Sequence, residues 1–127
     1  MQNNELLGLL ETFAAAWNAH DIDTLMACMT PENCVFYGAA GTSERGGQFH
    51  GPDQVRAAFK AVWEKFPDAR WNNPKHFVCG NRGYSEWLFS GSTADGKEKC
   101  LAHGVDLFEF ENGKIKVKDT YRKQISS

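Results

Sequence analysis

The sequence predicts an α+β fold, in which three N-terminal helices pack on a strongly curved antiparallel sheet to form a cone with an internal pocket. One change of pattern leads to this prediction. Apolar residues recur at helical spacing up to Phe66, and from Asp68 onward apolar and polar residues alternate as they do in strands. The length of 127 residues is typical of one domain, so we expect residues 1–127 to form a single domain.

Three segments carry the apolar stripe of an amphipathic helix. Pro31 ends the second segment, because proline cannot extend the hydrogen-bond ladder of a helix. Pro52 is a favoured first residue for the third segment, and Pro67 ends it. The three apolar stripes cover residues 6–17, 22–29 and 55–66.

Five segments are typical of strands, one before the third helix and four after it. Two tight turns separate the last three of these strands. Asp95-Gly96 and Asn112-Gly113 favour hairpin turns, because both residue pairs tolerate positive φ. The glycine-rich segment 38–47 is expected to be a loop, and it lacks the lysine and the following helix of a phosphate-binding loop. The expected strands are residues 34–37, 71–79, 84–93, 99–110 and 114–124. A sheet of this length must curl around the helices, which leaves a cavity for a small apolar molecule.

Composition and charge argue against several classes of partner. A formal net charge of −2 gives no general attraction to nucleic acid or to an anionic membrane. No apolar run reaches the length that spans a bilayer and the N-terminus lacks a signal peptide, so we expect a cytoplasmic protein. The cysteines and histidines have no metal-ligand spacing, so we expect neither a metal nor a cofactor.

Four segments carry a resemblance to a known family. They are residues 17–23 (WNAHDID), 49–55 (FHGPDQV), 104–115 (GVDLFEFENGKI) and 121–123 (YRK). In these segments the chain resembles the SnoaL-like polyketide cyclase and ketosteroid isomerase group of the nuclear transport factor 2-like superfamily. The resemblance implies a cystatin-like roll, but it does not fix a function, because this superfamily includes isomerases, cyclases, dehydratases, epoxide hydrolases and binding modules.

The catalytic positions of the ketosteroid isomerases are only partly matched. The position of their aspartate base looks like Tyr37, and the position of their tyrosine donor looks like Phe13. Their protonated aspartic acid looks like Asp106. One role of three is retained, so the comparison argues against steroid isomerase activity.

The limonene-type epoxide hydrolases are matched no better. The final aspartate of their Asp-Arg-Asp set looks like Thr120, with Asp119 one step away. The arginine of that set has no counterpart near Asp106, because its position is taken by Gly104.

Asp106 is the first candidate catalytic residue, because it interrupts an otherwise apolar strand between Val105 and Leu107. If its side chain faces the pocket, desolvation raises its pKa and favours the neutral acid. A neutral carboxylic acid there could donate a hydrogen bond to a carbonyl or enol oxygen, or serve as a general acid or base.

The facing of the last strand is open, because two arguments conflict. Hydrophobicity places Ile115, Val117 and Tyr121 inside, whereas the resemblance places Lys118, Thr120 and Arg122 in the pocket. An inward Lys118 should pair with Asp106 or Glu86, because a lone buried ammonium is too costly. Such a pair could bind a carboxylate or a carbonyl compound.

The remaining candidates depend on strand register. His103 is a catalytic candidate only if a β-bulge brings it to the Asp106 face. A two-residue turn at Asp95-Gly96 places Trp87 on that face, and a three-residue turn places Glu86 there. The expected ligand-binding residues are Phe13, Trp17, Tyr37, Phe59, Trp63, Glu86, Trp87, Thr120 and Arg122.

Two functions fit these observations. One is a cofactor-independent isomerase, cyclase or dehydratase that transfers a proton on a small apolar carbonyl compound. The other is a non-catalytic, dimeric ligand-binding or assembly module. In both cases we expect a homodimer through the outer sheet face, near Leu88, Leu101, His103 and Val105, because an antiparallel sheet with apolar residues on both faces needs a second cover.

Overall fold

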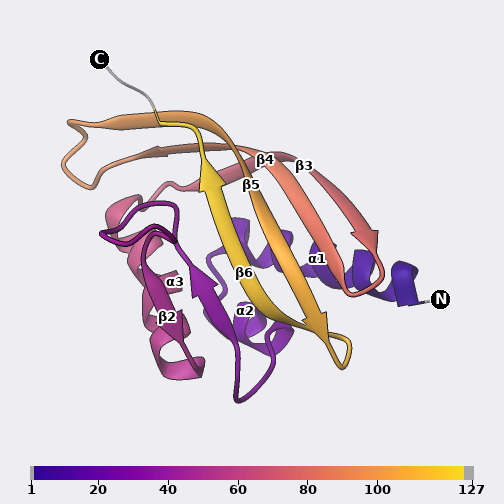
Figure 1. Cartoon of the computed structure of the whole chain (residues 1–127). Coiled ribbons are helices and arrows are strands. Elements are labelled where there is room, and N and C mark those ends of the chain that lie inside the picture. Colours follow the sequence, from indigo (N-terminus) through magenta and orange to yellow (C-terminus); the bar gives the residue numbers. More distant parts are fainter. Residues whose placement is uncertain (1, 125–127) are drawn as a thin grey trace.

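Three helices lie on one side of a six-stranded sheet in a computed structural model that describes residues 2–124 (Figure 1). The helices are α1 (Gln2–Ala19), α2 (Ile22–Cys28) and α3 (Pro52–Lys65). The strands are β1 (Val35–Tyr37), β2 (Gln48–His50), β3 (Arg70–Cys79), β4 (Arg82–Ser92), β5 (Lys99–Glu111) and β6 (Lys114–Arg122). The predicted α+β class is confirmed. Within the described residues, no helix is both long and apolar enough to cross a membrane.

The sheet is open and mixed, which differs from the expected antiparallel sheet in one pairing. Its order is β2-β1-β6-β5-β4-β3, and all neighbours are antiparallel except β1 and β6. The meander of four long strands follows the predicted hairpins. β2 was not predicted, because this three-residue edge strand is too short to show an alternating pattern.

Aromatic rings fill the space between the helices and the inner sheet face. Phe13 on α1 meets Phe59 on α3 and Phe108 on β5 edge to face, with ring centroids 6.2 and 5.9 Å apart. All three side chains are at most 2% exposed. The rings therefore fix the helices against the sheet through apolar burial and edge-to-face contact.

A bulge in β6 decides which residues of that strand face inward. Glu109 pairs with Val117 and Phe110 pairs with Ile115, so Lys116 is an extra residue in β6. The extra residue shifts the alternation by one. As a result both Ile115 and Lys118, three positions apart, are buried on the inner face.

The register between β4 and β5 places Trp87 on the inner face, opposite Gly104. This is the register of the two-residue turn at Asp95-Gly96, one of the two alternatives that the sequence allows. The indole of Trp87 lies against Gly104. A Cβ at that position would collide with the ring and would lie 2.8 Å from the Tyr121 carbonyl oxygen.

We expect Gly104→Ala to destabilise the fold by about 1–3 kcal/mol, because the added methyl group must displace Trp87 or the backbone of β6. Urea unfolding followed by tryptophan fluorescence measures this change. Gly8→Ala in α1 is the matched control, since nothing lies near the added methyl group and alanine favours the helix by about 0.5–1 kcal/mol. Equal effects of the two changes would contradict the packing of Trp87 on Gly104.

Candidate functional site

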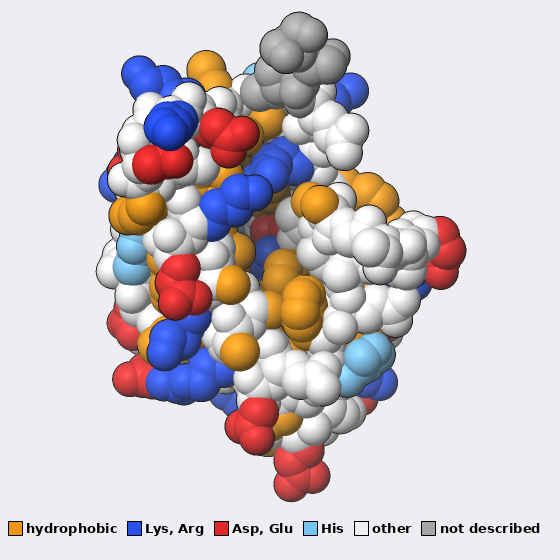
Figure 2. All heavy atoms as spheres, turned by 90° about the vertical axis from the view of Figure 1, so that its left-hand side faces the viewer, with side chains coloured by type: hydrophobic (Ala, Val, Ile, Leu, Met, Phe, Trp, Pro, Cys, Tyr) orange, Lys and Arg blue, Asp and Glu red, His pale blue; other side chains and the backbone are white. Residues whose placement is uncertain are grey.

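A cavity of about 550 Å³ opens between α3, the segment after β1 and the inner face of the sheet. Its aromatic walls come from Trp17, Phe36, Phe49, Phe66, Trp71 and Trp87. Helix α3 contributes the small side chains of Ala57, Ala58 and Ala61 in its middle, together with Gln54, Val62 and Lys65. Figure 2 shows a hollow in this side of the molecule, with apolar side chains within it and basic side chains along its upper edge. The volume suits a small organic molecule.

A buried ion pair lies at the inner end of this cavity. The Lys118 Nζ is 3.0 Å from Asp106 Oδ1, and the two residues are 4% and 5% exposed. Lys118 lines the cavity, whereas Asp106 lies behind it. Of the two expected partners, Asp106 and Glu86, Lys118 therefore pairs with Asp106. Lys118, Thr120 and Arg122 face inward, as the resemblance implies, and Ile115 of the competing set is buried as well.

Two further donors face the carboxylate of Asp106. The Trp87 Nε1–H donates to Oδ2 at 3.0 Å, and the Thr120 hydroxyl donates to Oδ1 at 2.6 Å. The Lys118 ammonium also donates to Thr120 Oγ1 at 2.7 Å. Because every neighbour donates to the two carboxyl oxygens, the arrangement suits an ionised carboxylate rather than the expected neutral acid.

Aromatic rings also lie close to the ammonium of Lys118. The Nζ lies 4.6 Å from the ring centroid of Phe36 and 5.1 Å from that of Trp17. Burial lowers the pKa of Lys118, and the negative charge of Asp106 opposes this shift. The rings and the carboxylate together compensate the ammonium for its lost hydration.

The predicted ligand-binding residues divide into two groups on the inner side. Trp17, Trp87, Thr120 and Arg122 line the cavity. Phe13 and Phe59 are core residues that do not line it, and Trp63 stacks on His20 with ring centroids 4.9 Å apart.

Tyr37, Glu86 and His103 lie outside the cavity, so their predicted roles in it are wrong. Tyr37 alternates with the inward Phe36, and the Arg45 guanidinium lies 4.1 Å from its ring centroid. Glu86 follows the inward Ser85, and β5 has no bulge that would bring His103 inside.

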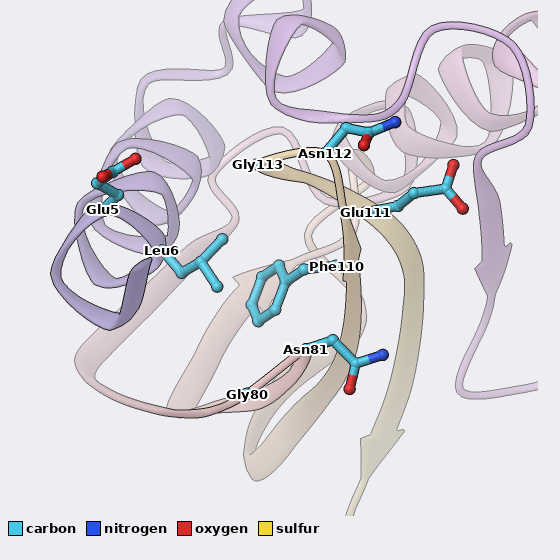
Figure 3. Close-up of a pocket in the computed structure, with 8 residues that line it drawn as sticks. All are labelled: Glu5, Leu6, Gly80, Asn81, Phe110, Glu111, Asn112 and Gly113. Carbon is cyan, nitrogen blue, oxygen red and sulfur yellow. The ribbon is translucent and has the colours of Figure 1, made fainter. Parts of the chain in front are cut away.

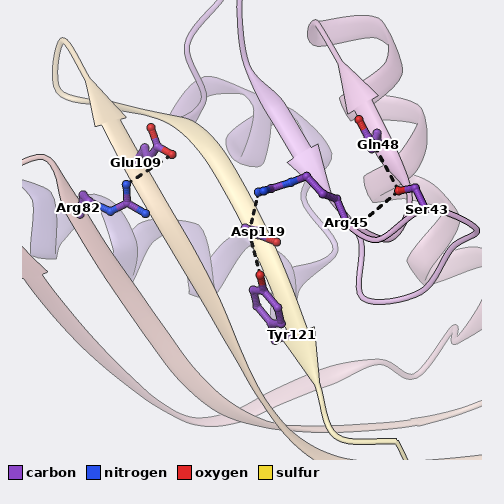
Figure 4. Close-up of polar contacts among 7 residues, drawn as sticks. All are labelled: Ser43, Arg45, Gln48, Arg82, Glu109, Asp119 and Tyr121. Carbon is purple, nitrogen blue, oxygen red and sulfur yellow. Dashed lines mark hydrogen bonds and ion pairs between the residues drawn. The ribbon is translucent and has the colours of Figure 1, made fainter.

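Asp119 also lies on the outer face, where its side chain meets Arg45 and Tyr121 (Figure 4). The Arg45 guanidinium is 3.1 Å from the Asp119 carboxylate. Burial raises the pKa of Asp119, and the charge of Arg45 opposes this shift. Thr120 therefore points into the cavity and Asp119 points out of it, so the epoxide hydrolase set is not assembled.

Several cavity residues were missed by the sequence analysis. Phe36 and Phe49 come from three-residue strands, whose facing depends on register. Phe66 follows the end of α3, and Trp71 lies at the start of β3. The alanines at positions 57, 58 and 61 carried a usable signal, because small residues on the inner side of an amphipathic helix leave space beside the sheet.

A second hollow lies at the other end of β6, beside the start of α1 and the β3–β4 and β5–β6 turns (Figure 3). Its lining residues are Glu5, Leu6, Gly80, Asn81, Phe110, Glu111, Asn112 and Gly113. None of the predicted site residues lies there. The cavity at Lys118 is therefore the candidate site.

We expect Lys118→Met to cost about 3–5 kcal/mol of unfolding free energy, because Asp106 is left buried without its cation. The double variant Lys118→Met/Asp106→Asn should cost less than the sum of the single changes, as measured by urea unfolding. The exposed pair Arg82–Glu109, at 3.7 Å, is the control, and its disruption should cost less than about 1 kcal/mol. Strict additivity at Lys118 and Asp106 would contradict their direct coupling.

Comparison with known proteins agrees with this fold. Solved structures with similar folds include a candidate polyketide cyclase from Xanthomonas campestris pv. campestris (TM-score 0.81, 16% identity, 95% of this chain and 92% of that one). Another is Bal32a from a soil-derived mobile gene cassette (TM-score 0.84, 17% identity, 98% of this chain and 93% of that one). A third is an NTF2-like protein of unknown function from Mesorhizobium loti (TM-score 0.79, 22% identity, 98% of this chain and 95% of that one).

Identities this low show the fold alone, and no curated protein matches the sequence. The model of the SnoaL-like domain family matches residues 10–117. This chain therefore belongs to the SnoaL-like domain family.

Proposed function

We propose that this protein binds a small apolar carbonyl compound and moves a proton on it, as in isomerisation, cyclisation or dehydration. The observation that carries the proposal is the position of Lys118. Its ammonium is held by Asp106 and lines an otherwise largely aromatic cavity. A cation fixed in an apolar site is a strong hydrogen-bond donor to an oxygen atom that gains negative charge.

The residues around Lys118 suggest how the proton moves. The C–H bond next to the carbonyl group breaks, its electron pair forms the enolate, and Lys118 donates a hydrogen bond to the enolate oxygen. Thr120 Oγ1 accepts the proton and passes its own proton to Asp106 Oδ1, to which it already donates at 2.6 Å. Lys118 occupies one lone pair of the Thr120 hydroxyl, so a second lone pair is free for the substrate proton.

The alternative function is binding without catalysis, and one observation favours it. Asp106 lies behind Lys118 and Thr120 rather than on the cavity wall, and its oxygens already accept three contacts. In this alternative Lys118, Thr120 and Asp106 orient a ligand and leave it chemically unchanged.

We expect the protein to accelerate exchange of the α-protons of 2-tetralone in D₂O, observed by proton NMR. Thr120→Val should slow this exchange at least about tenfold, because the relay to Asp106 is lost. Lys118→Gln should slow it similarly, because the enolate loses its cation. Lys60→Gln, which changes an exposed lysine on α3, is the matched control and should exchange as fast as the unaltered protein.

The same experiment separates the two functions. Binding of 2-tetralone with no exchange above the buffer rate would reject proton transfer and leave the binding module. Unchanged exchange in both Thr120→Val and Lys118→Gln would reject the proposed residues.

We further propose that a second copy of the chain covers the outer sheet face. Leu101 on β5 is 61% exposed there, and Tyr121 on β6 is 54% exposed. Leu107 lies on the same side of β5, and Phe77 on β3 stacks on Tyr84. Apolar side chains that share one sheet face are typical of a protein interface.

Leu101→Glu should therefore give a monomer, because a carboxylate would be buried between the copies without a partner. Sedimentation velocity at micromolar concentration measures this, with Ala15→Glu on the exposed side of α1 as the control. A monomer for the unaltered protein would refute the dimer.

A further inference from the structure

The cavity is lined by more basic side chains than the one that the Lys118–Asp106 ion pair neutralises. Three basic residues, Lys65, Lys118 and Arg122, line it, and no Asp or Glu does so among residues 2–124. Asp106 neutralises Lys118 from behind. Neither Lys65 nor Arg122 has an ion-pair partner within the described part of the chain.

Arg122 is the better placed of these two residues. It ends β6 and faces the same side as Lys118, four positions away, which corresponds to roughly 13 Å between the Cα atoms. Its guanidinium carbon lies 5.0 Å from the ring centroid of Phe89, on the inner face of β4. This contact holds the guanidinium in place and leaves its edge free to donate hydrogen bonds.

The surroundings of Arg122 are also basic. The neighbouring hollow, which shares Lys65 and Arg122 with the cavity, adds Lys99 and Lys123 and a single acid, Glu98. An anion at the entrance would therefore meet a net positive field.

We propose that the ligand is an apolar carboxylate whose acid group binds to the Arg122 guanidinium while its body fills the aromatic cavity. For a keto acid, the ketone oxygen reaches Lys118 at the inner end; this part rests on the proposed function. A planar guanidinium binds a carboxylate through two parallel hydrogen bonds, a geometry that Lys65 does not offer. The apolar walls exclude water and strengthen this contact.

The test compares 6-oxo-6-phenylhexanoate with its primary amide, which has the same shape without the charge. Isothermal titration calorimetry should show that the protein binds the acid about tenfold to a hundredfold more tightly than the amide. Arg122→Met keeps an apolar side chain over Phe89 and should reduce this preference to less than about threefold. Arg122→Lys should restore part of it, and Lys60→Met, which changes an exposed lysine on α3 that does not line the cavity, should leave it unchanged.

Three results would overturn the proposal: equal binding of acid and amide, a full preference in Arg122→Met, or no binding of the acid at millimolar concentration. The result is independent of proton transfer. Acid preference without α-proton exchange of 2-tetralone would leave this inference standing and reject catalysis. Exchange without acid preference would reject only the carboxylate ligand.

Discussion

The buried Lys118–Asp106 pair is the interaction on which the rest of the site depends. An ammonium and a carboxylate that are both about 5% exposed have lost most of their hydration. Their attraction offsets this loss only if the remaining donors and acceptors are satisfied. Trp87, Thr120 and the surrounding rings supply those contacts, so the aromatic walls support the charge as well as a ligand.

Two backbone features make this arrangement accessible. The bulge at Lys116 lets Ile115 fill the core and still directs Lys118 inward, which a regular strand could not do. The missing side chain at Gly104 lets the Trp87 indole lie across β5 and reach Asp106. The site is therefore set by strand register more than by the choice of catalytic residue types.

The sequence predicted the elements well, because helical stripes and hairpin turns are local signals. It also singled out Asp106, since a charged residue in an apolar strand is unusual, whereas Lys118 was placed in the pocket by the family resemblance alone. The facing of β6 was left open because a bulge leaves no mark in a hydrophobic pattern. His103 and Glu86 were tied to a bulge and to a turn register that the structure does not have. Tyr37 was assigned to the cavity wrongly, because a shift of one residue reverses the face of a strand. Phe36 and the alanines of α3 were missed, since the cavity exists only after β1 and α3 meet the sheet.

The most direct test of the account is the titration of the Lys118 side chain in solution. The Cε–H signal of Lys118, assigned by its loss in Lys118→Arg, can be followed by NMR through an alkaline titration. We expect Lys118 to lose its proton at lower pH than the exposed lysines, because burial lowers its pKa, and its signal to move when an aryl ketone is added. A signal that titrates with the exposed lysines and does not respond to the ketone would contradict a buried, ligand-facing ammonium.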